Sequence, residues 1–498
     1  MTSSADIDGG TDSSFTLVAG EPDPRRFKAL AVIATAQLMI ALDVSVATIA
    51  LPPAQQALHI SVANRQWALT AYTLAFGGLL LLGGRIADYL GRKRVLIWSL
   101  VGFGIASALG GLAQDQAMLF AARALQGAMA AMMAPAALSL ITVTFTEERE
   151  RHKAFGVYGA VSGAGAAVGL ILGGLLTQYV SWRWNLLITA PIAIVAALAA
   201  AREVTESRAE RRSGYDIPGA VTVTAGLLAV VYGFTRAATD GWGSSVTLTF
   251  LLVGAVLLVI FTLIESKVAN PLLPLRVVLD RNRGASFLAV MLLGASTVAT
   301  WLFLTYYFEQ NLGYSAIKTG LAFLPLSASV VVGVTISTRL MARVGARYLT
   351  AGAFALATIG LVIYTQIQAH SSYPALILPA MILWGLGFGG AFVVLSNTAL
   401  LGVTHHDAGV ASALVNATQQ VGGTIGVAVL NTIAASVTAN YLSNHHHGPT
   451  TQAAAAAQGY TIAFIVAAAL FGAGAIMCLL SLRASHNPAT AELQLDLI

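Results

Sequence analysis

The fold is decided by the stretch Gly84-Arg85-Ile86-Ala87-Asp88-Tyr89-Leu90-Gly91-Arg92-Lys93-Arg94-Val95-Leu96. Two long apolar runs flank this stretch, which holds four basic residues, one acid and two glycines within thirteen positions. Hydrocarbon does not accommodate so many charges, so we expect a tight turn at a membrane face. The excess of Arg and Lys indicates that this face is cytoplasmic, and it therefore sets the orientation of the neighbouring spans.

The whole chain has the composition of a membrane protein. Of its 498 residues, 57% are hydrophobic and 10% are charged, and the mean hydropathy is +0.75. A soluble domain carries about a quarter charged residues, so we predict an all-α polytopic membrane protein. The net charge of +5 does not indicate nucleic-acid binding, because 22 of the 27 Lys and Arg residues lie in segments that we assign to the cytoplasm.

Hydropathy predicts 14 transmembrane helices. We place them near residues 29–50, 65–84, 94–113, 117–144, 154–176, 184–201, 217–236, 246–265, 285–308, 317–340, 347–368, 374–400, 408–436 and 459–482. Residues 1–27 are polar and lack the features of a secretory signal, so we interpret them as a disordered cytoplasmic tail. An even number of spans then leaves both termini in the cytoplasm, at the inner (cytoplasmic) cell membrane.

A second copy of the charged turn lies further along the chain. Residues 339–347 repeat residues 85–93 at an offset of 254, with Ala342 in the place of Asp88. We therefore predict two parallel six-helix halves related by an axis along the membrane normal, an arrangement typical of secondary transporters. The predicted units are residues 28–201 and 284–483 for the halves, 202–283 for a linker with two inserted helices, and 484–498 for a second cytoplasmic tail.

The charged turn resembles the loop motif of the major facilitator superfamily. The matching residues are Gly84, Asp88, Gly91, Arg92 and Lys93. Gly91 suits a reversal that requires a positive φ angle. The resemblance implies a two-half major facilitator fold in which Asp88 contacts the second half, near 407–409, and acts as a conformational latch. An ordinary positively charged turn is the alternative.

Asp43 lies deep in the first predicted span. A charge at this depth costs at least about 2.5 kcal/mol, so we expect it to have a partner or a task. Residues 42–52 resemble the first-span motif of drug–proton antiporters, and this implies that Asp43 loads and releases a proton. A purely structural buried acid is the alternative interpretation.

Arg123 is the only Arg or Lys that lies away from the ends of a predicted span. It shares one helix face with Gln126 and Gly127, and the segment resembles the fourth-span motif of the same family. The resemblance implies a part in proton coupling, and we expect Arg123 to pair with Asp43. A static pair that only locks two spans together remains the alternative.

The fifth predicted span is rich in glycine. Gly165, Gly169 and Gly173 recur at a spacing of four, with Gly174 beside them, so a bare helix face permits close packing. The segment resembles the antiporter motif of exporters, although the usual proline is missing. Without this proline, the motif does not decide whether the direction of transport is export or import.

Two further polar features are weaker signals. Glu309 closes the ninth span and is either a second protonatable group or, more simply, an exposed charge at a helix end. The run His445-His446-His447 lies on a predicted loop at 441–458 without partner ligands, so we expect no metal site. We expect no cofactor either, and the chain has no phosphate-binding loop that would drive nucleotide-dependent pumping.

The resemblance extends over most of the chain and points to the 14-span drug–proton antiporters (EmrB/QacA type). It implies efflux of small hydrophobic or cationic compounds, driven by protons, from a protein that functions as a monomer in the lipid bilayer. A dedicated exporter or importer of one endogenous metabolite is the second hypothesis. A membrane enzyme is the third, and we disfavour it because the loops are too short for a catalytic domain.

Overall fold

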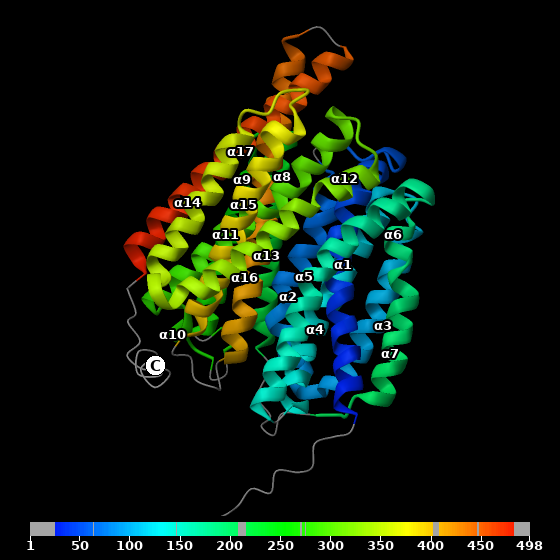
Figure 1. The fold of residues 1–498 in the computed structure, drawn as a ribbon, viewed down its shortest axis with the longest axis vertical. Coiled ribbons are helices and arrows are strands. Elements are labelled where there is room, and N and C mark those ends of the chain that lie inside the picture. Colours follow the sequence, from blue (N-terminus) through cyan, green and yellow to red (C-terminus); the bar gives the residue numbers. More distant parts are fainter. Residues whose placement is uncertain are drawn as a thin grey trace, which may run out of the picture.

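The computed structural model describes residues 25–62, 64–145, 147–207, 216–268, 271–273, 275–401, 408–445 and 448–482. Their regular structure is helical, and the helices form two groups that lie side by side (Figure 1). The first group is α1 Arg26–Ala57, α2 Trp67–Leu90, α3 Arg92–Gly111, α4 Gln116–Thr144, α5 Glu148–Tyr179, α6 Trp184–Leu187 and α7 Thr189–Glu203. The inserted hairpin is α8 Ile217–Asp240 and α9 Ser245–Glu265, and the short α10 Leu275–Val278 follows it.

The second group repeats the first. It consists of α11 Arg281–Tyr306 with the π-helical turn η1 Tyr307–Asn311, α12 Ala316–Ala322, α13 Leu324–Val344, α14 Ala346–Tyr364, η2 Tyr373–Ile377 with α15 Leu378–Leu400, α16 Ala408–Ser443 and α17 Pro449–Ser481. In the first group α1 packs on α5, α2 and α3 pack on α4, and α3 packs on α7. In the second group α11 packs on α16, α13 and α14 pack on α15, and α14 packs on α17. The same pairings in the same order are what two parallel six-helix halves require.

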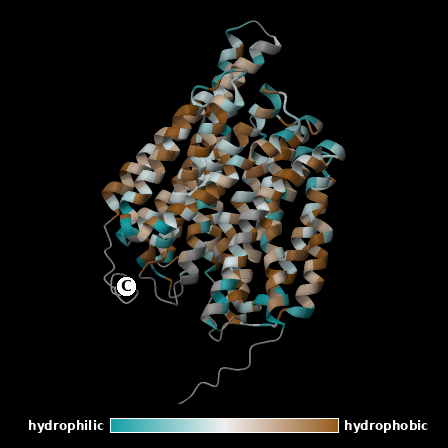
Figure 2. Ribbon diagram, in the orientation of Figure 1, coloured by the Kyte–Doolittle hydropathy of each residue, from teal (hydrophilic) through white to brown (hydrophobic). Residues whose placement is uncertain are grey.

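Twelve helical segments of the described chain are long and apolar enough to cross a membrane. Two shorter apolar stretches, Trp67–Leu80 of α2 and Ala167–Tyr179 of α5, add to them. Hydrophobic residues cover most of the length of the helices, and hydrophilic residues gather toward their ends (Figure 2). The prediction of an all-helical membrane fold is therefore confirmed, and twelve of the fourteen predicted spans meet the criteria of length and composition.

The prediction of a long loop before the last span is wrong. Helix α16 continues to Ser443 and α17 already begins at Pro449, so most of residues 441–458 is helical. With 36 and 33 residues, the two helices are about 50 Å long and exceed the ~30 Å of hydrocarbon. They project past the other helices as a hairpin at the top of Figure 1. The alanine run that opens α17 explains the error, because alanine favours helix without any need for a hydrophobic pattern.

The two ends of the molecule differ. We call the end where α1 begins the loop end, because Gly91 and its equivalent Gly345 lie in the turns there, and the opposite end the far end. Gly91 has φ +106° and Gly345 has φ +79°, so both turns use a conformation that favours glycine. The repeat at an offset of 254 is thus a repeat of backbone geometry as well as of sequence.

The inserted hairpin α8–α9 lies against both halves. Helix α8 packs on α2 and on α16, where Thr224 donates to the Gly78 carbonyl at 3.2 Å and Thr432 donates to the Phe234 carbonyl at 3.0 Å. One small apolar cluster joins Leu74 of α2, Val231 of α8 and Ala428 of α16. The hairpin therefore covers one side of the seam between the halves.

Candidate functional site

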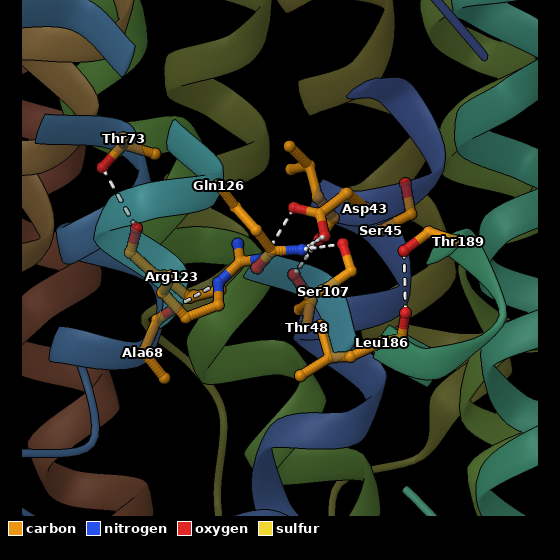
Figure 3. Close-up of polar contacts among 12 residues, drawn as sticks. Asp43, Ser45, Thr48, Ala68, Thr73, Ser107, Arg123, Gln126, Leu186 and Thr189 are labelled. Carbon is orange, nitrogen blue, oxygen red and sulfur yellow. Dashed lines mark hydrogen bonds and ion pairs between the residues drawn. The ribbon is translucent and has the colours of Figure 1, made fainter. Parts of the chain in front are cut away.

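A buried polar cluster lies inside the first half, between α1 and α4. Arg123 Nη1 donates to Asp43 Oδ2 at 2.6 Å and to Gln126 Oε1 at 2.9 Å, and Gln126 Nε2 donates to Asp43 Oδ1 at 2.9 Å. The three side chains turn toward one another in Figure 3. Asp43 and Gln126 are fully buried and Arg123 is 2% exposed, so water does not reach this cluster in the described conformation. The predicted pair of Asp43 and Arg123 is present.

Two neighbouring helices complete the cluster. Gln126 Nε2 also donates to Ser107 Oγ of α3 at 2.8 Å, and Arg123 Nε donates to the Ala68 carbonyl of α2 at 2.9 Å. The ring of Tyr72 lies 4.5 Å from the guanidinium carbon of Arg123, which adds a cation–π contact. Sequence reasoning did not identify Ser107, Ala68 or Tyr72, because neither periodicity nor motif spacing reports contacts across helices.

Gly127 of α4 allows α2 to pack closely against α4. A Cβ atom at Gly127 would lie 2.2 Å from the Tyr72 carbonyl oxygen, a distance that no side chain tolerates. Because Gly127 is four residues after Arg123, the two share one face of α4, and this is the face against which α2 packs. The Ala68 carbonyl can then act as an acceptor for Arg123 even though it belongs to a helix.

The glycine row of α5 packs on α1 beside Asp43. Cβ atoms at Gly165, Gly169 and Gly173 would lie 2.9 Å from Ala41, 2.9 Å from Ser45 and 3.2 Å from Val46. These contacts bracket position 43, so the bare face of α5 lies against the segment that carries the carboxylate. Such a contact has few interlocking side chains and suits helices that slide against each other.

Gly174 contacts the second half. A Cβ atom there would lie 2.8 Å from the Ala316 carbonyl oxygen of α12, and a Cβ at Gly320 would lie 2.4 Å from the Leu170 carbonyl oxygen. The helices α5 and α12 therefore touch backbone to backbone at the far end. The predicted glycine motif thus serves two interfaces, one inside the first half and one between the halves.

Four other contacts join the halves toward the far end, and sequence reasoning missed them. Arg65 of the turn before α2 donates from Nε to Asn431 Oδ1 of α16 at 3.2 Å, and its guanidinium lies 4.0 Å from the ring centre of Tyr306. Tyr306 of α11 donates from its hydroxyl group to Gln55 of α1. The hydroxyl groups of Thr73 and Thr424 share a hydrogen bond of 2.7 Å, again across the seam.

The charged turn is held by the end of α7 and the segment that follows it. The backbone N–H of Lys93 donates to Glu206 Oε1 at 3.1 Å, the backbone N–H of Arg92 donates to the Ser207 carbonyl at 3.0 Å, and Lys93 Nζ donates to the Ala201 carbonyl at 2.8 Å. Glu206 thus lies at the positive N-terminus of α3. Gly84 packs loosely on Pro135 of α4.

The expected latch between the halves lies outside the described residues. The side chain of Asp88 and residues 402–407 are not described, so the structure leaves that contact untested. His446 and His447 also lie outside the described residues. His445 stacks on Tyr441 with ring centres 4.0 Å apart, and no group of three or more potential metal-ligating side chains occurs in the described part of the chain.

Glu309 does not join the Asp43 cluster. It lies in the π-helical turn η1 at the far end of α11, and its Oε1 atom is buried without a hydrogen-bond partner. The side chain as a whole is half-buried, so the simpler prediction of an exposed helix-end charge is wrong.

Comparisons with known proteins indicate the family and the fold of the chain. A sequence model described as the Major Facilitator Superfamily matches residues 33–427. Among solved structures, a bacterial homologue of the human lysosomal transporter Spinster superposes with a TM-score of 0.65 over 93% of this chain and 100% of that chain. The identity is 15%, so this similarity concerns the fold alone.

Similar sequences include resistance and export proteins. The puromycin resistance protein pur8 of Streptomyces alboniger is 48% identical over 449 residues, which are 90% of this chain and 89% of that protein. The cephamycin export protein CmcT of Amycolatopsis lactamdurans is 40% identical and covers 82% of this chain and 85% of that protein. The multidrug resistance protein Stp of Mycobacterium tuberculosis is 29% identical, with coverage of 84% and 78%.

Proposed function

The chain belongs to the Major Facilitator Superfamily, and on that premise we propose that it exports antibiotic-like compounds in exchange for protons. It is a membrane transporter and not an enzyme. The observation that carries the proposal is the sealed Asp43–Arg123–Gln126 cluster inside a fold whose two halves meet around a seam. Relatives that share 40–48% of their residues with this chain are named for puromycin resistance and cephamycin export, which supports the direction and the class of cargo.

The proton acts at Asp43. When the carboxylate is ionised, it holds Arg123 at 2.6 Å and Gln126 at 2.9 Å. Protonation removes that negative charge and leaves Arg123 as a buried cation without a counter-charge, which is costly and favours rearrangement. A cationic or hydrogen-bonding cargo that competes with the proton for the carboxylate couples the two fluxes.

Alternating access requires the far end to open and close. In the described conformation the far end is closed by the contacts of Arg65, Tyr306, Gly174 and Gly320. These contacts are polar or backbone-to-backbone, but Tyr306 also belongs to an apolar cluster to which both halves contribute, so opening of the far end must separate apolar side chains as well. We assign the loop end to the cytoplasm, so that cargo is released at the far end once these contacts break.

We further propose that the chain has fourteen spans, as hydropathy suggested. Helix α2 has 24 residues and α5 has 32, so each is long enough to cross ~30 Å of hydrocarbon when counted as a whole. Both termini then lie in the cytoplasm. Each half, the cluster and the seam belong to one chain, which supports function as a monomer, and Asp88 remains the proposed latch at the loop end.

A dedicated exporter of one compound is the second candidate. The names of two close relatives each refer to a single antibiotic, and this favours a narrow substrate range. The fold and the proton step are the same in both cases. The missing proline of the antiporter motif does not reverse the proposal, because Gly165, Gly169 and Gly173 still form the bare face that lies against α1.

Transport into reconstituted vesicles tests the proposal. We expect labelled puromycin or a related amphipathic cation to be driven against its gradient when a pH gradient is imposed, and the accumulation to collapse when a protonophore dissipates that gradient. Transport that ignores the pH gradient would refute proton coupling. A panel of structurally unrelated antibiotics separates the two candidates, since a dedicated exporter transports one of them and a multidrug exporter several.

A further inference from the structure

The two ends of the inserted hairpin meet at the loop end and bring two carboxyl groups together. Asp216 precedes α8, and its Oδ1 accepts the Gly219 backbone N–H at 2.8 Å as a helix cap. Glu265 is the last residue of α9, and its Oε2 accepts the Leu273 backbone N–H at 2.9 Å. Asp216 is 2% exposed and Glu265 is 3% exposed, although neither belongs to the Asp43 cluster.

The second oxygen of each carboxyl group has no donor. Asp216 Oδ2 and Glu265 Oε1 are both buried and without a hydrogen-bond partner. Both point at the same place, because a Cβ atom built on Gly219 would lie 2.3 Å from Asp216 Oδ2 and 2.8 Å from Glu265 Oε1. The two carboxyl groups therefore face the same small space beside Gly219. Ionised carboxylates only accept hydrogen bonds, so two that face each other form a direct hydrogen bond only when one of them is protonated.

Electrostatics favours one proton shared by the pair. Two neighbouring carboxylates that are shielded from water cannot both carry charge at low cost. The positive N-terminus of α8 stabilises an ionised Asp216, whereas the negative C-terminus of α9 disfavours an ionised Glu265. Arg85 of α2 opposes this proton, because its positive charge favours an ionised Glu265. It also donates from Nη2 to the Pro271 carbonyl at 3.0 Å.

We propose that Glu265 is protonated and donates this proton to Asp216 Oδ2, so that the inserted hairpin holds a proton-binding site of its own. The proton joins the start of α8 to the end of α9 beside Arg85, a residue of the charged turn. Since α8 packs on α2 and on α16, the site also fixes the position of a helix that touches both halves. The inference does not depend on the export of drugs or on the role of Asp43.

Infrared spectroscopy of the full-length protein in lipid tests the site directly. We expect the carbonyl band of a protonated carboxylic acid near neutral pH, which shifts in heavy water and is lost in Glu265→Gln. Asp216→Asn removes the same band, because its amide donates to an ionised Glu265 and makes the proton unnecessary. An unchanged acid band in both variants overturns the proposal, and the second variant keeps the test valid if the first does not fold.

The pH dependence of thermal unfolding gives an independent measurement. A folded state that binds one proton more than the unfolded state loses stability as the pH rises. We therefore expect the unfolding midpoint of the wild type to fall relative to that of Glu265→Gln from about pH 4.3, where a glutamate of the unfolded chain ionises, to about pH 7. The control is Glu203→Gln, because Glu203 is a partly exposed acid beside Lys28 at the same end. The difference in unfolding midpoint between this variant and the wild type should not change with pH. Parallel curves for the wild type and Glu265→Gln contradict the proposal.

Discussion

Gly127→Ala probes the packing on which the buried cluster depends. The new Cβ atom would lie 2.2 Å from the Tyr72 carbonyl oxygen, whereas ordinary contact begins at 3.4 Å. Helices α2 and α4 must therefore separate by about 1 Å. This movement lengthens the 2.9 Å hydrogen bond between Arg123 Nε and the Ala68 carbonyl to about 4 Å, which breaks it.

The cost of this substitution follows from the two effects. Overpacking costs about 1–3 kcal/mol, and the loss of a hydrogen bond to a charged group costs about 1.5–3 kcal/mol. We expect the Gly127→Ala variant to lose about 2.5–6 kcal/mol of stability and to unfold at a clearly lower temperature in detergent. Proton-driven transport should fall with it, because Arg123 no longer holds its position against Asp43.

Gly352→Ala is the matched control. Gly352 lies in α14 on an exposed face, and a Cβ atom there meets nothing within 4 Å. Alanine is about 1 kcal/mol more favourable than glycine inside a helix, so this variant should be as stable as the wild type or slightly more stable. If Gly127→Ala and Gly352→Ala show the same unfolding temperature and the same transport rate, the close approach of α2 to α4 does not support the cluster.

Three further predictions concern the seam between the halves, the two glycine turns and Glu309. Arg65→Ala removes the contacts with Asn431 and Tyr306 that help to close the far end. In a protein with a cysteine introduced at Thr73, an impermeant thiol reagent added at the far end should therefore label that cysteine faster when Arg65 is also replaced. An unchanged labelling rate would contradict a closed far end. Gly91→Ala should lower the free energy of unfolding more than Gly345→Ala does. Both substitutions introduce about 1–2 kcal/mol of backbone strain, but only Gly91→Ala places a Cβ atom 2.6 Å from the Glu206 carboxylate. Equal losses would argue against that contact. Glu309→Gln should keep or raise the unfolding temperature, since Glu309 Oε1 is buried without a donor, and a large loss would reveal an ion pair.

The sequence alone predicts the features that depend on single residues in a membrane. A lone acid and a lone base at membrane depth are each costly, so their pairing at Asp43 and Arg123 was predictable without coordinates. The repeat of the charged turn predicted two parallel halves, and the matching backbone conformations of Gly91 and Gly345 bear this out. These inferences rest on the cost of charge in hydrocarbon and on the backbone freedom of glycine.

The remaining features depend on contacts between distant helices. Ser107 and the Ala68 carbonyl have no sequence signal, because a serine or a backbone carbonyl at a helix face is common. Arg65 is the first residue of the second predicted span, and nothing in the sequence indicates that it bridges the halves. Asp216 and Glu265 stood in two charged connections almost fifty residues apart, and only the hairpin brings them together.

Asp43→Asn tests the central claim most directly, with Asp115→Asn as the control. Asp115 is an exposed aspartate that caps α4 through the Met118 backbone N–H at 2.8 Å, and asparagine preserves such a cap. In reconstituted vesicles we expect Asp43→Asn to exchange labelled cargo for unlabelled cargo at equilibrium but to lose accumulation driven by a pH gradient, while Asp115→Asn retains both. Accumulation by Asp43→Asn that matches the wild type under the same gradient would contradict proton coupling at this carboxylate.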